Sequence, residues 1–311
     1  MTRLMILLTA IFTLLGASNF ALAAGEIASG GEKQWQEKVV NNYQEVLALF
    51  ERLDYTETFW RDGERAVPRV YIATIPKRWS KETSKEITVQ LKKKIFFRTL
   101  GPLVLRSNEL ILQDRAKLET LAGKSGSLDS EQLKWLEELS GYYRASWDPA
   151  QIGNVIAELL VKVDALPTSL IIAQAVEESG WGTSRFAFSG NALFGQWTWG
   201  DDGITPEQQR SGMGDYKIAA FDSPLQSVQA HARNLNTHPA YQALRDMRAE
   251  KRKAGQAFTG MDAATTLTKY SERGEAYVKT LHSIISYNKL QTTDAAYLKE
   301  MEAIVLVPEA H

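Results

Sequence analysis

The sequence predicts a mainly helical fold that contains one small β lobe. Between residues 83 and 290, most segments place apolar residues at helical spacing, and capping residues, glycines or prolines separate the segments. Residues 197–222 differ, because glycines interrupt short segments there and residues 216–221 have the pattern of a strand. Cysteine is absent from the 311 residues, so packing alone must stabilise the fold.

The first part of the chain predicts a helical N-terminal region over residues 24–147. An amphipathic helix is expected between Trp35 and Phe50, where apolar residues recur on one face. Residues 67–79 are expected to be extended, as an edge strand or a strap, because Pro68 and Pro76 flank β-branched residues.

Three more helices are expected in this region. Thr83 and Glu86 have the spacing of a capping box for a helix that ends near residue 100. The Gly-Pro pair at 101–102 then predicts a break or kink before a second helix, which ends near residue 121. Asp129 and Gln132 start a further helix after a short linker.

A second domain is predicted over residues 148–291. Asp148 is the expected N-cap of its first helix, with Pro149 at the first helical position. Further helices are expected to begin, in chain order, at Pro224, Pro239, Asp262 and just after Gly274. Residues 292–311 are predicted to be a C-terminal tail with a surface helix over residues 294–301.

Residues 1–23 have the pattern of a secretory signal peptide. Arg3 precedes an apolar run over residues 4–15, and residues 21–23, Ala-Leu-Ala, supply the small residues of a cleavage site. The run is short for a membrane span, and no other stretch of about 18 apolar residues exists. The sequence therefore predicts an exported chain with no integral membrane segment after cleavage, with an uncleaved anchor as the alternative.

Charge and histidine content exclude several classes of function. The chain has 36 lysines and arginines against 37 aspartates and glutamates. It lacks the basic excess that binding to phosphate backbones requires, so nucleic acid is not expected as a partner. The four histidines are scattered, without the spacing of metal ligands, so no metal and no cofactor are expected.

The stretch that carries the chemistry begins with an apolar helix after Pro167. Residues 170–176 are almost all apolar, which predicts a buried helix, and Gly180 supplies the left-handed residue that commonly ends one. Glu177 and Glu178 therefore lie in the last turn, where the helix dipole and desolvation both raise a carboxyl pKa. A raised pKa suits a general acid near neutral pH, although adjacent acids at a helix end are commonly surface residues.

Aromatic residues cluster directly after this helix. They lie among glycines and an asparagine rather than at helical spacing. Aromatic faces suit sugar rings and side-chain amides suit sugar hydroxyls, whereas core packing is the alternative explanation. The predicted substrate-binding residues are Trp181, Asn191, Phe194, Gln196, Trp197 and Trp199.

Two segments form a specific pattern: residues 173–184, AQAVEESGWGTS, and residues 191–195, NALFG. They resemble the signature of bacterial peptidoglycan endo-β-N-acetylglucosaminidases of the lysozyme-like superfamily. Residues 221–223, Tyr270 and Tyr277 are similar to later motifs of that family in order and spacing. Segments 67–76 and 94–108 further resemble the Bax-type subgroup of Gram-negative bacteria, so the resemblance covers most of the mature chain.

The resemblance implies an α+β lysozyme-like fold, with a helical glucosaminidase domain, a small β-hairpin lobe and a helical region before them. It aligns the family's catalytic glutamate with Glu178 and gives Tyr270 a supporting role, for which a core tyrosine is the alternative. The lobe departs from the family pattern at the second catalytic group. That group stays open between the substrate acetamido group and four acids of the lobe, namely our candidate Asp215 and its neighbours Asp201, Asp202 and Glu207.

The predicted function is a monomeric peptidoglycan hydrolase of the periplasm that cleaves the N-acetylglucosaminyl-β-1,4-N-acetylmuramyl bond of glycan strands. One alternative is a lytic transglycosylase on the same glycan, which needs only one glutamate and leaves a 1,6-anhydro sugar. The other is a non-catalytic wall-binding protein on the same fold. A retaining or inverting outcome depends on a carboxyl separation that residue spacing does not give.

Overall fold

The computed structural model describes residues 35–124, 126–201, 203–209, 212 and 214–309, so the predicted signal peptide lies outside the described residues. The fold is mainly helical with small β-sheets, as the sequence predicts. The chain forms two compact units. The first comprises Met1–Leu103, Ala175–Val228 and Ala296–His311, and the second comprises Val104–Gln174 and Gln229–Ala295.

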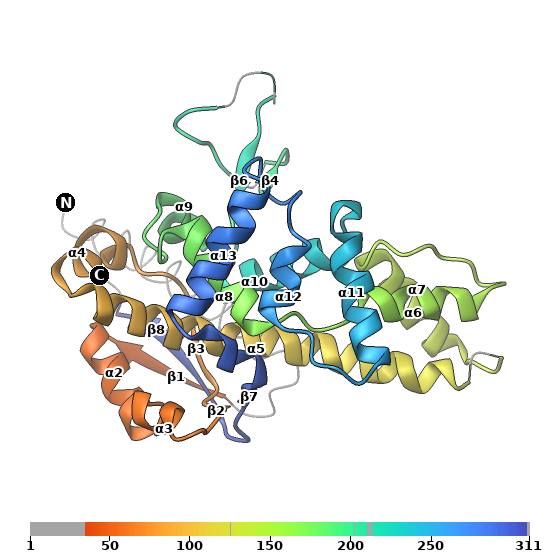
Figure 1. The fold of residues 1–311 in the computed structure, drawn as a ribbon, viewed down its shortest axis with the longest axis horizontal. Coiled ribbons are helices and arrows are strands. Elements are labelled where there is room, and N and C mark those ends of the chain that lie inside the picture. Colours follow the sequence, from red (N-terminus) through yellow and green to blue (C-terminus); the bar gives the residue numbers. More distant parts are fainter. Residues whose placement is uncertain (1–34, 125, 202, 210–211, 213, 310–311) are drawn as a thin grey trace, which may run out of the picture. The chain divides into compact units, whose positions relative to one another are not determined.

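A three-stranded parallel sheet lies in the first unit, with the C-terminal strand β8 in the middle (Figure 1). Residues 303–307 of β8 are all buried, which explains why this strand is apolar without alternation. A second pair of parallel strands is formed by β2, which precedes β3 in the chain, and β7, which precedes β8. The strands are β1 (Trp35–Val40), β2 (Ala66–Val67), β3 (Val70–Ile72), β7 (Tyr297–Leu298) and β8 (Ala303–Pro308).

Two predictions about these segments are wrong. The helix expected from Trp35 begins only at Tyr43, as α2 (Tyr43–Arg52), because residues 35–40 form β1. The helix expected over residues 294–301 is instead the end of a 3-10 helix, η3 (Leu290–Ala295), followed by β7. Strand β1 pairs with β8 through contacts such as Trp35 with Ala303, and no local pattern reveals a partner so far along the chain. The extended segment expected at 67–79 is confirmed in its first part, since β3 is an edge strand, but its last residues, 77–79, are helical and Trp79 starts a π-helical turn.

Three short helices follow or precede these strands: α3 (Glu57–Arg61), the π-helical turn η1 (Trp79–Thr83) and α4 (Ser84–Glu86). The capping box expected at Thr83 is not formed, because Thr83 belongs to η1 and makes no side-chain cap bond. The next helix, α5 (Val89–Ala122), starts later, where Thr88 Oγ1 accepts a hydrogen bond from the Leu91 N–H.

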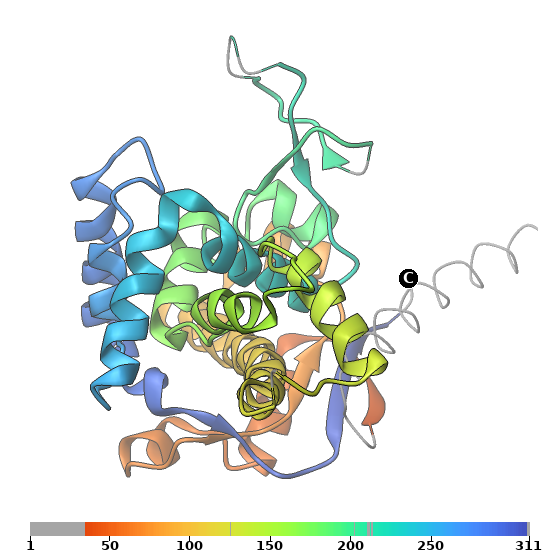
Figure 2. The same cartoon turned by 90° about the vertical axis from the view of Figure 1, so that its right-hand side faces the viewer.

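Of the break or kink expected at residues 101–102, the break is not found. Helix α5 runs unbroken through Pro102, side-on in Figure 1 and nearly end-on in Figure 2. A Cβ on Gly101 would lie 3.2 Å from Tyr55 Oη, so glycine permits close packing there, and the burial of this turn outweighs the cost of an internal proline. Neither α5 nor any other helix among the described residues has the length and apolar character needed to cross a membrane.

The small β lobe is confirmed and lies in the first unit. Its strands are antiparallel in the order β4-β6-β5, one strand more than a hairpin. A short helix, α9 (Arg185–Gly190), precedes the lobe and contacts β5; the lobe is drawn in teal in Figure 2. The strands are β4 (Trp197–Thr198), β5 (Gly203–Ile204) and β6 (Lys217–Ala219).

The second unit is helical. The capping box of Asp129 and Gln132 is confirmed, whereas Asp148 forms a turn with the Ala150 N–H and α7 begins at Ile152, after the expected position. Likewise Thr259, not Asp262, is the N-cap of α12, and Asp262 completes its capping box. The helices lying within this unit are α6 (Ser130–Tyr142), α7 (Ile152–Lys162), η2 (Pro239–Tyr241), α11 (Gln242–Lys253), α12 (Gly260–Thr265), α13 (Glu275–Tyr287) and η3.

A buried ionic cluster lies inside the second unit. Asp164 is 2% exposed, and both of its carboxylate oxygens accept hydrogen bonds from Arg252. Arg115 and Arg248 lie 3.5 Å and 3.8 Å from Oδ2 of the same carboxylate. Arg248 also donates to the Asp164 carbonyl and to Asn236 Oδ1, and burial lowers its pKa to about 10. The cluster connects α5, α11 and the segment after α7.

Candidate active site

The glutamate singled out by the sequence lies at the end of α8 (Thr168–Ser179). Residues 170–176 of this helix are buried, as predicted, and Gly180 has φ +57°, the left-handed conformation that ends the helix. Glu177 and Glu178 are both half-buried in the last turn. Two carboxylates therefore lie at a helix C-terminus, on the edge of a packed core.

The backbone directly after these carboxylates is left-handed over three consecutive residues. Gly180, Trp181 and Gly182 have φ values of +57°, +66° and +71°. This conformation costs a residue with a Cβ roughly 1–2 kcal/mol, so contacts must hold Trp181 in place. Part of the support is local, because Ser179 Oγ, in a residue 1% exposed, accepts a 2.8 Å hydrogen bond from the Gly182 N–H.

The Trp181 side chain is half-buried within the first unit. Its ring meets Phe96 and Phe97 edge-on, with centroids 5.7 Å and 5.4 Å away, and the Lys93 ammonium lies 5.1 Å from the ring centroid. Its carbonyl accepts a 3.0 Å hydrogen bond from Trp79 Nε1. Trp181 is thus part of the protein's own packing, and a sugar contact for it stays a prediction.

Asn191 ends α9 in the left-handed conformation, with φ +51°, and is 7% exposed. Its Oδ1 accepts hydrogen bonds from Thr74 Oγ1 and the Ile75 N–H, and its Nδ2 donates to the Phe221 carbonyl. Phe194 is 3% exposed. This geometry favours a scaffold role for Asn191 and Phe194 over the direct sugar contact expected from the sequence.

The exposed aromatic residues gather on the β lobe. Trp197 and Trp199 are 37% and 67% exposed, and their ring centroids lie 6.2 Å apart. Trp197 stacks on Tyr216 at 4.3 Å with an angle of 23° between the rings. Tyr216, which the sequence analysis did not select, belongs to the lobe core with Ile218, and strand alternation places both on one face. Gln196 is half-buried beside them.

The described carboxylates of the lobe are surface groups. Asp201, Glu207 and Asp215 are all exposed, and Asp202 lies outside the described residues. Glu207 Oε1 lies 3.5 Å from Arg185 Nε, an ordinary surface ion pair. Their surroundings therefore do not distinguish one of them as a second catalytic group, and Asp215 stays a prediction.

Tyr270 belongs to the second unit, where it is half-buried beyond the end of α12. Its ring stacks on Tyr277 at 5.1 Å and meets His231 edge-on at 5.9 Å. Gln174, one turn before Glu178 in α8, donates to Tyr277 Oη and accepts from His231 Nε2. Tyr270 is thus part of an aromatic and hydrogen-bonded network, and a role for it at Glu178 stays a prediction.

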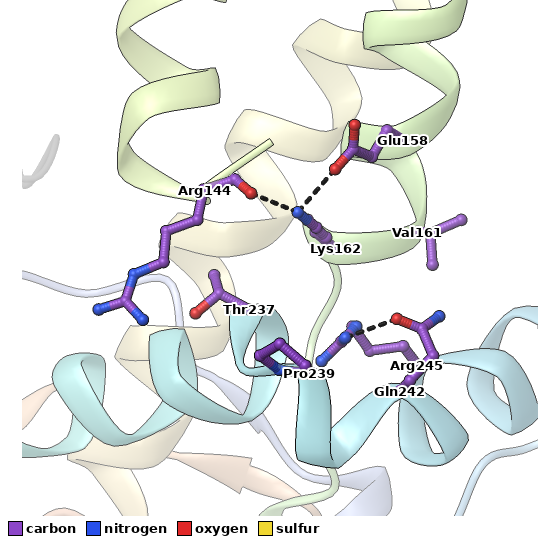
Figure 3. Close-up of a pocket in the computed structure, with 8 residues that line it drawn as sticks. All are labelled: Arg144, Glu158, Val161, Lys162, Thr237, Pro239, Gln242 and Arg245. Atoms are coloured by element: carbon purple, nitrogen blue, oxygen red, sulfur yellow. Dashed lines mark hydrogen bonds and ion pairs between the residues drawn. The ribbon is translucent and has the colours of Figure 1, made fainter. Parts of the chain in front are cut away.

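A pocket of about 450 Å³ lies in the second unit, and none of the site residues predicted from the sequence lines it (Figure 3). Lys162 Nζ donates to Glu158 and to the Arg144 carbonyl inside it. The lining holds no aromatic ring on which a sugar could stack. It consists of Arg144, Glu158, Val161, Lys162, Thr237, Pro239, Gln242 and Arg245.

Comparison with known proteins gives three findings. A family model described as mannosyl-glycoprotein endo-β-N-acetylglucosaminidase matches residues 154–290. Protein bax of Escherichia coli (strain K12) is 32% identical over 199 residues, which cover 64% of this chain and 70% of that protein. The solved catalytic domain of the autolysin Auto from Listeria monocytogenes matches at 21% identity and a TM-score of 0.34, over 54% of this chain and 89% of that domain.

Proposed function

Because this chain belongs to the Bax-type glucosaminidase family, we propose that it is a monomeric periplasmic hydrolase of peptidoglycan. Its reaction is cleavage of the N-acetylglucosaminyl-β-1,4-N-acetylmuramyl bond. The observation that carries the proposal is the position of Glu178. This half-buried carboxylate ends a buried helix and precedes a loop whose left-handed backbone is fixed by hydrogen bonds and ring contacts.

In this proposal Glu178 is the general acid. Cleavage of a glycosidic bond requires a proton on the departing oxygen, because an alkoxide is a poor leaving group. The C-terminus of a helix such as α8 carries partial negative charge from the helix dipole, which favours the protonated carboxyl over the carboxylate. A protonated carboxyl at this position can give its proton to the leaving sugar.

Trp197 and Trp199 are the proposed platform for the glycan. Both rings are exposed on a lobe whose core side is filled by Tyr216, so the stacking face of each tryptophan is set by the protein before a sugar arrives. Sugar rings present C–H faces to such aromatics and hydroxyls to side-chain amides such as that of Gln196.

The second catalytic group is proposed to be the substrate acetamido group, whose oxygen attacks the anomeric carbon as the protonated sugar departs, before water opens the cyclic intermediate. The exposure of Asp201, Glu207 and Asp215 favours this choice, because an acid that stabilises an oxocarbenium-like centre is generally shielded from water. Asp215 remains the lobe acid to test. The same exposure keeps the lytic transglycosylase as the second candidate, since that reaction requires only one acid.

The test is the product chemistry of the purified mature protein on isolated peptidoglycan. Hydrolysis is expected to give fragments with a reducing N-acetylglucosamine end, identified by mass spectrometry after borohydride reduction. A 1,6-anhydro muramyl end would identify the transglycosylase instead. A gel containing peptidoglycan that shows no clearing zone under the active protein band would leave only the wall-binding alternative.

A further inference from the structure

We propose that Trp79 and Ser80 are positioning residues for Glu178, an inference that rests on the proposed function. Both belong to η1, which precedes α5 in the N-terminal part of the chain. Each donates a side-chain hydrogen bond to a backbone carbonyl of residues 180–183, named here the 180–183 loop. Only Ser179 separates the loop from Glu178, so the loop backbone sets the direction in which the last turn of α8 presents the carboxyl group.

Both hydrogen bonds run from a neutral side-chain donor to a backbone carbonyl of the 180–183 loop. Trp79 Nε1–H donates to the Trp181 carbonyl at 3.0 Å, and Ser80 Oγ–H donates to the Thr183 carbonyl at 2.5 Å. Ser80 is 8% exposed and Trp79 is half-buried, so water competes weakly for the serine donor. A hydrogen bond between neutral groups of this kind contributes about 0.5–1.5 kcal/mol, enough to select between loop conformations.

The 180–183 loop needs such support because it is strained. Trp181 has φ +66°, a conformation that costs roughly 1–2 kcal/mol at a residue with a side chain and persists only where the surroundings determine it. The loop also packs closely against its neighbours: a Cβ added to Gly182 would lie 3.3 Å from Phe96 and 3.5 Å from Trp79 Nε1. Strained backbone held by several neighbours is typical of sites where geometry must be exact to a fraction of an ångström.

All of these supports come from residues 79–97, which lie before the stretch matched by the family model, residues 154–290. The N-terminal part of the chain therefore contributes more than stability, since it completes the backbone next to the proposed acid. In the same unit, Ser179 Oγ accepts from the Gly182 N–H, so hydrogen bonds hold the loop at residues 181, 182 and 183.

The experiment compares Trp79→Phe and Ser80→Ala with wild type on soluble peptidoglycan fragments, measuring kcat, KM and the pH dependence of kcat. Phenylalanine keeps a ring but removes the N–H, and alanine removes the hydroxyl. Each variant is expected to lower kcat about tenfold and to leave KM within about twofold, because a displaced acid harms the transition state more than binding. The pH at which kcat declines on the alkaline side of the profile is also expected to differ from that of wild type.

Matched controls separate positioning from general packing. Trp60→Phe, in α3, and Ser84→Ala, at a serine 5% exposed in α4, are expected to keep kcat and the pH profile of wild type. Ser80→Thr retains a hydroxyl and is expected to restore most of the lost kcat. If Trp79→Phe does not unfold cooperatively, the comparison of Ser80→Ala with Ser80→Thr alone tests the positioning role.

The inference is overturned if Ser80→Ala keeps the wild-type kcat and pH profile while Glu178→Gln is inactive, a result that leaves the proposed function intact. It is also overturned if the positioning variants and the controls lose kcat equally. If Glu178→Gln retains wild-type rates, the proposed function itself fails, and changes at Trp79 would then have another cause.

Discussion

The two units hold their key side chains by different forces. In the first unit, the 180–183 loop is fixed by neutral donors, Trp79 and Ser80, and by aromatic contacts, with Lys93 over the Trp181 ring as the one charged neighbour named above. In the second unit, Asp164 is surrounded by three arginines and is almost fully buried.

This difference suggests that the first unit carries the reacting group and that the ionic cluster of the second unit supports the fold. A group that must release a proton near neutral pH is best placed among neutral dipoles, because a nearby cation would favour its charged form and prevent transfer. A buried carboxylate that only supports the fold has the opposite requirement, since without paired cations its burial would cost several kcal/mol. Mutations in the first unit should therefore change the reaction, and mutations at the ionic cluster should change stability.

The largest expected effect is on the reaction. Glu178→Gln is expected to lower the rate of peptidoglycan cleavage by about 100- to 10,000-fold, because the amide keeps the size but cannot donate the proton. Glu177→Gln, on the neighbouring residue, is the matched control and is expected to retain most of the rate. Cleavage rates on purified sacculi and urea unfolding curves measure both properties. An inactive Glu177→Gln variant would move the assignment to the other glutamate.

The second effect is on stability. Asp164→Asn is expected to lower the free energy of unfolding by about 3–5 kcal/mol, because it leaves Arg248 buried without its anion. The exposed Asp246→Asn is the control and should stay within about 0.5 kcal/mol of wild type. Urea denaturation at neutral pH gives both values. Equal stabilities for the two variants would show that the ionic cluster does not stabilise the second unit.

Local signals in the sequence were sufficient for much of the candidate site. The buried helix before Glu178, the left-handed Gly180 and the small β lobe all follow from patterns within a few residues, because caps, turns and hydrophobic spacing act locally. The capping box of Asp129 and Gln132 was found for the same reason.

Long-range pairing and packing could not be found in this way. Strand β8 is an apolar run near the C-terminus, and its pairing with β1 and β3 depends on segments distant in sequence. Pro102 predicts a break, yet packing of the buried turn keeps α5 continuous. The scaffold bonds of Asn191 and the ring contacts of Trp181 are equally non-local, so a motif could name these residues without giving their contacts.

The third prediction concerns pH and the second unit. Burial lowers the pKa of His231 to about 3, below the value of about 6.5 in an unfolded chain. Between these values the unfolded chain binds the proton and the folded chain does not, so acid favours unfolding. The contribution of neutral His231 to the free energy of unfolding is present above pH 6.5. It is lost as the pH falls, by about 2 kcal/mol between pH 6.5 and 5.

Unfolding of wild type and His231→Gln at pH 7 and pH 5 tests this. Glutamine can still donate to Gln174 but does not titrate, so the variant is expected to lose about 2 kcal/mol less than wild type over this interval. His238→Gln, at an exposed histidine, should keep the wild-type pH dependence. Parallel pH dependences for wild type and His231→Gln would contradict the prediction.

The smallest effect is expected at the edge of the β lobe, where binding and stability can be separated by comparing neighbours. Trp199→Ala is expected to weaken glycan binding about fivefold, or about 1 kcal/mol, and to leave unfolding unchanged because the ring is 67% exposed. Trp197→Ala removes a ring stacked on Tyr216 and should therefore also destabilise the fold by about 0.5–1.5 kcal/mol. Titration of soluble glycan into the Glu178→Gln background measures binding without turnover. Equal destabilisation by both variants would mean that Trp199 packs as a core residue instead of presenting a face to sugar.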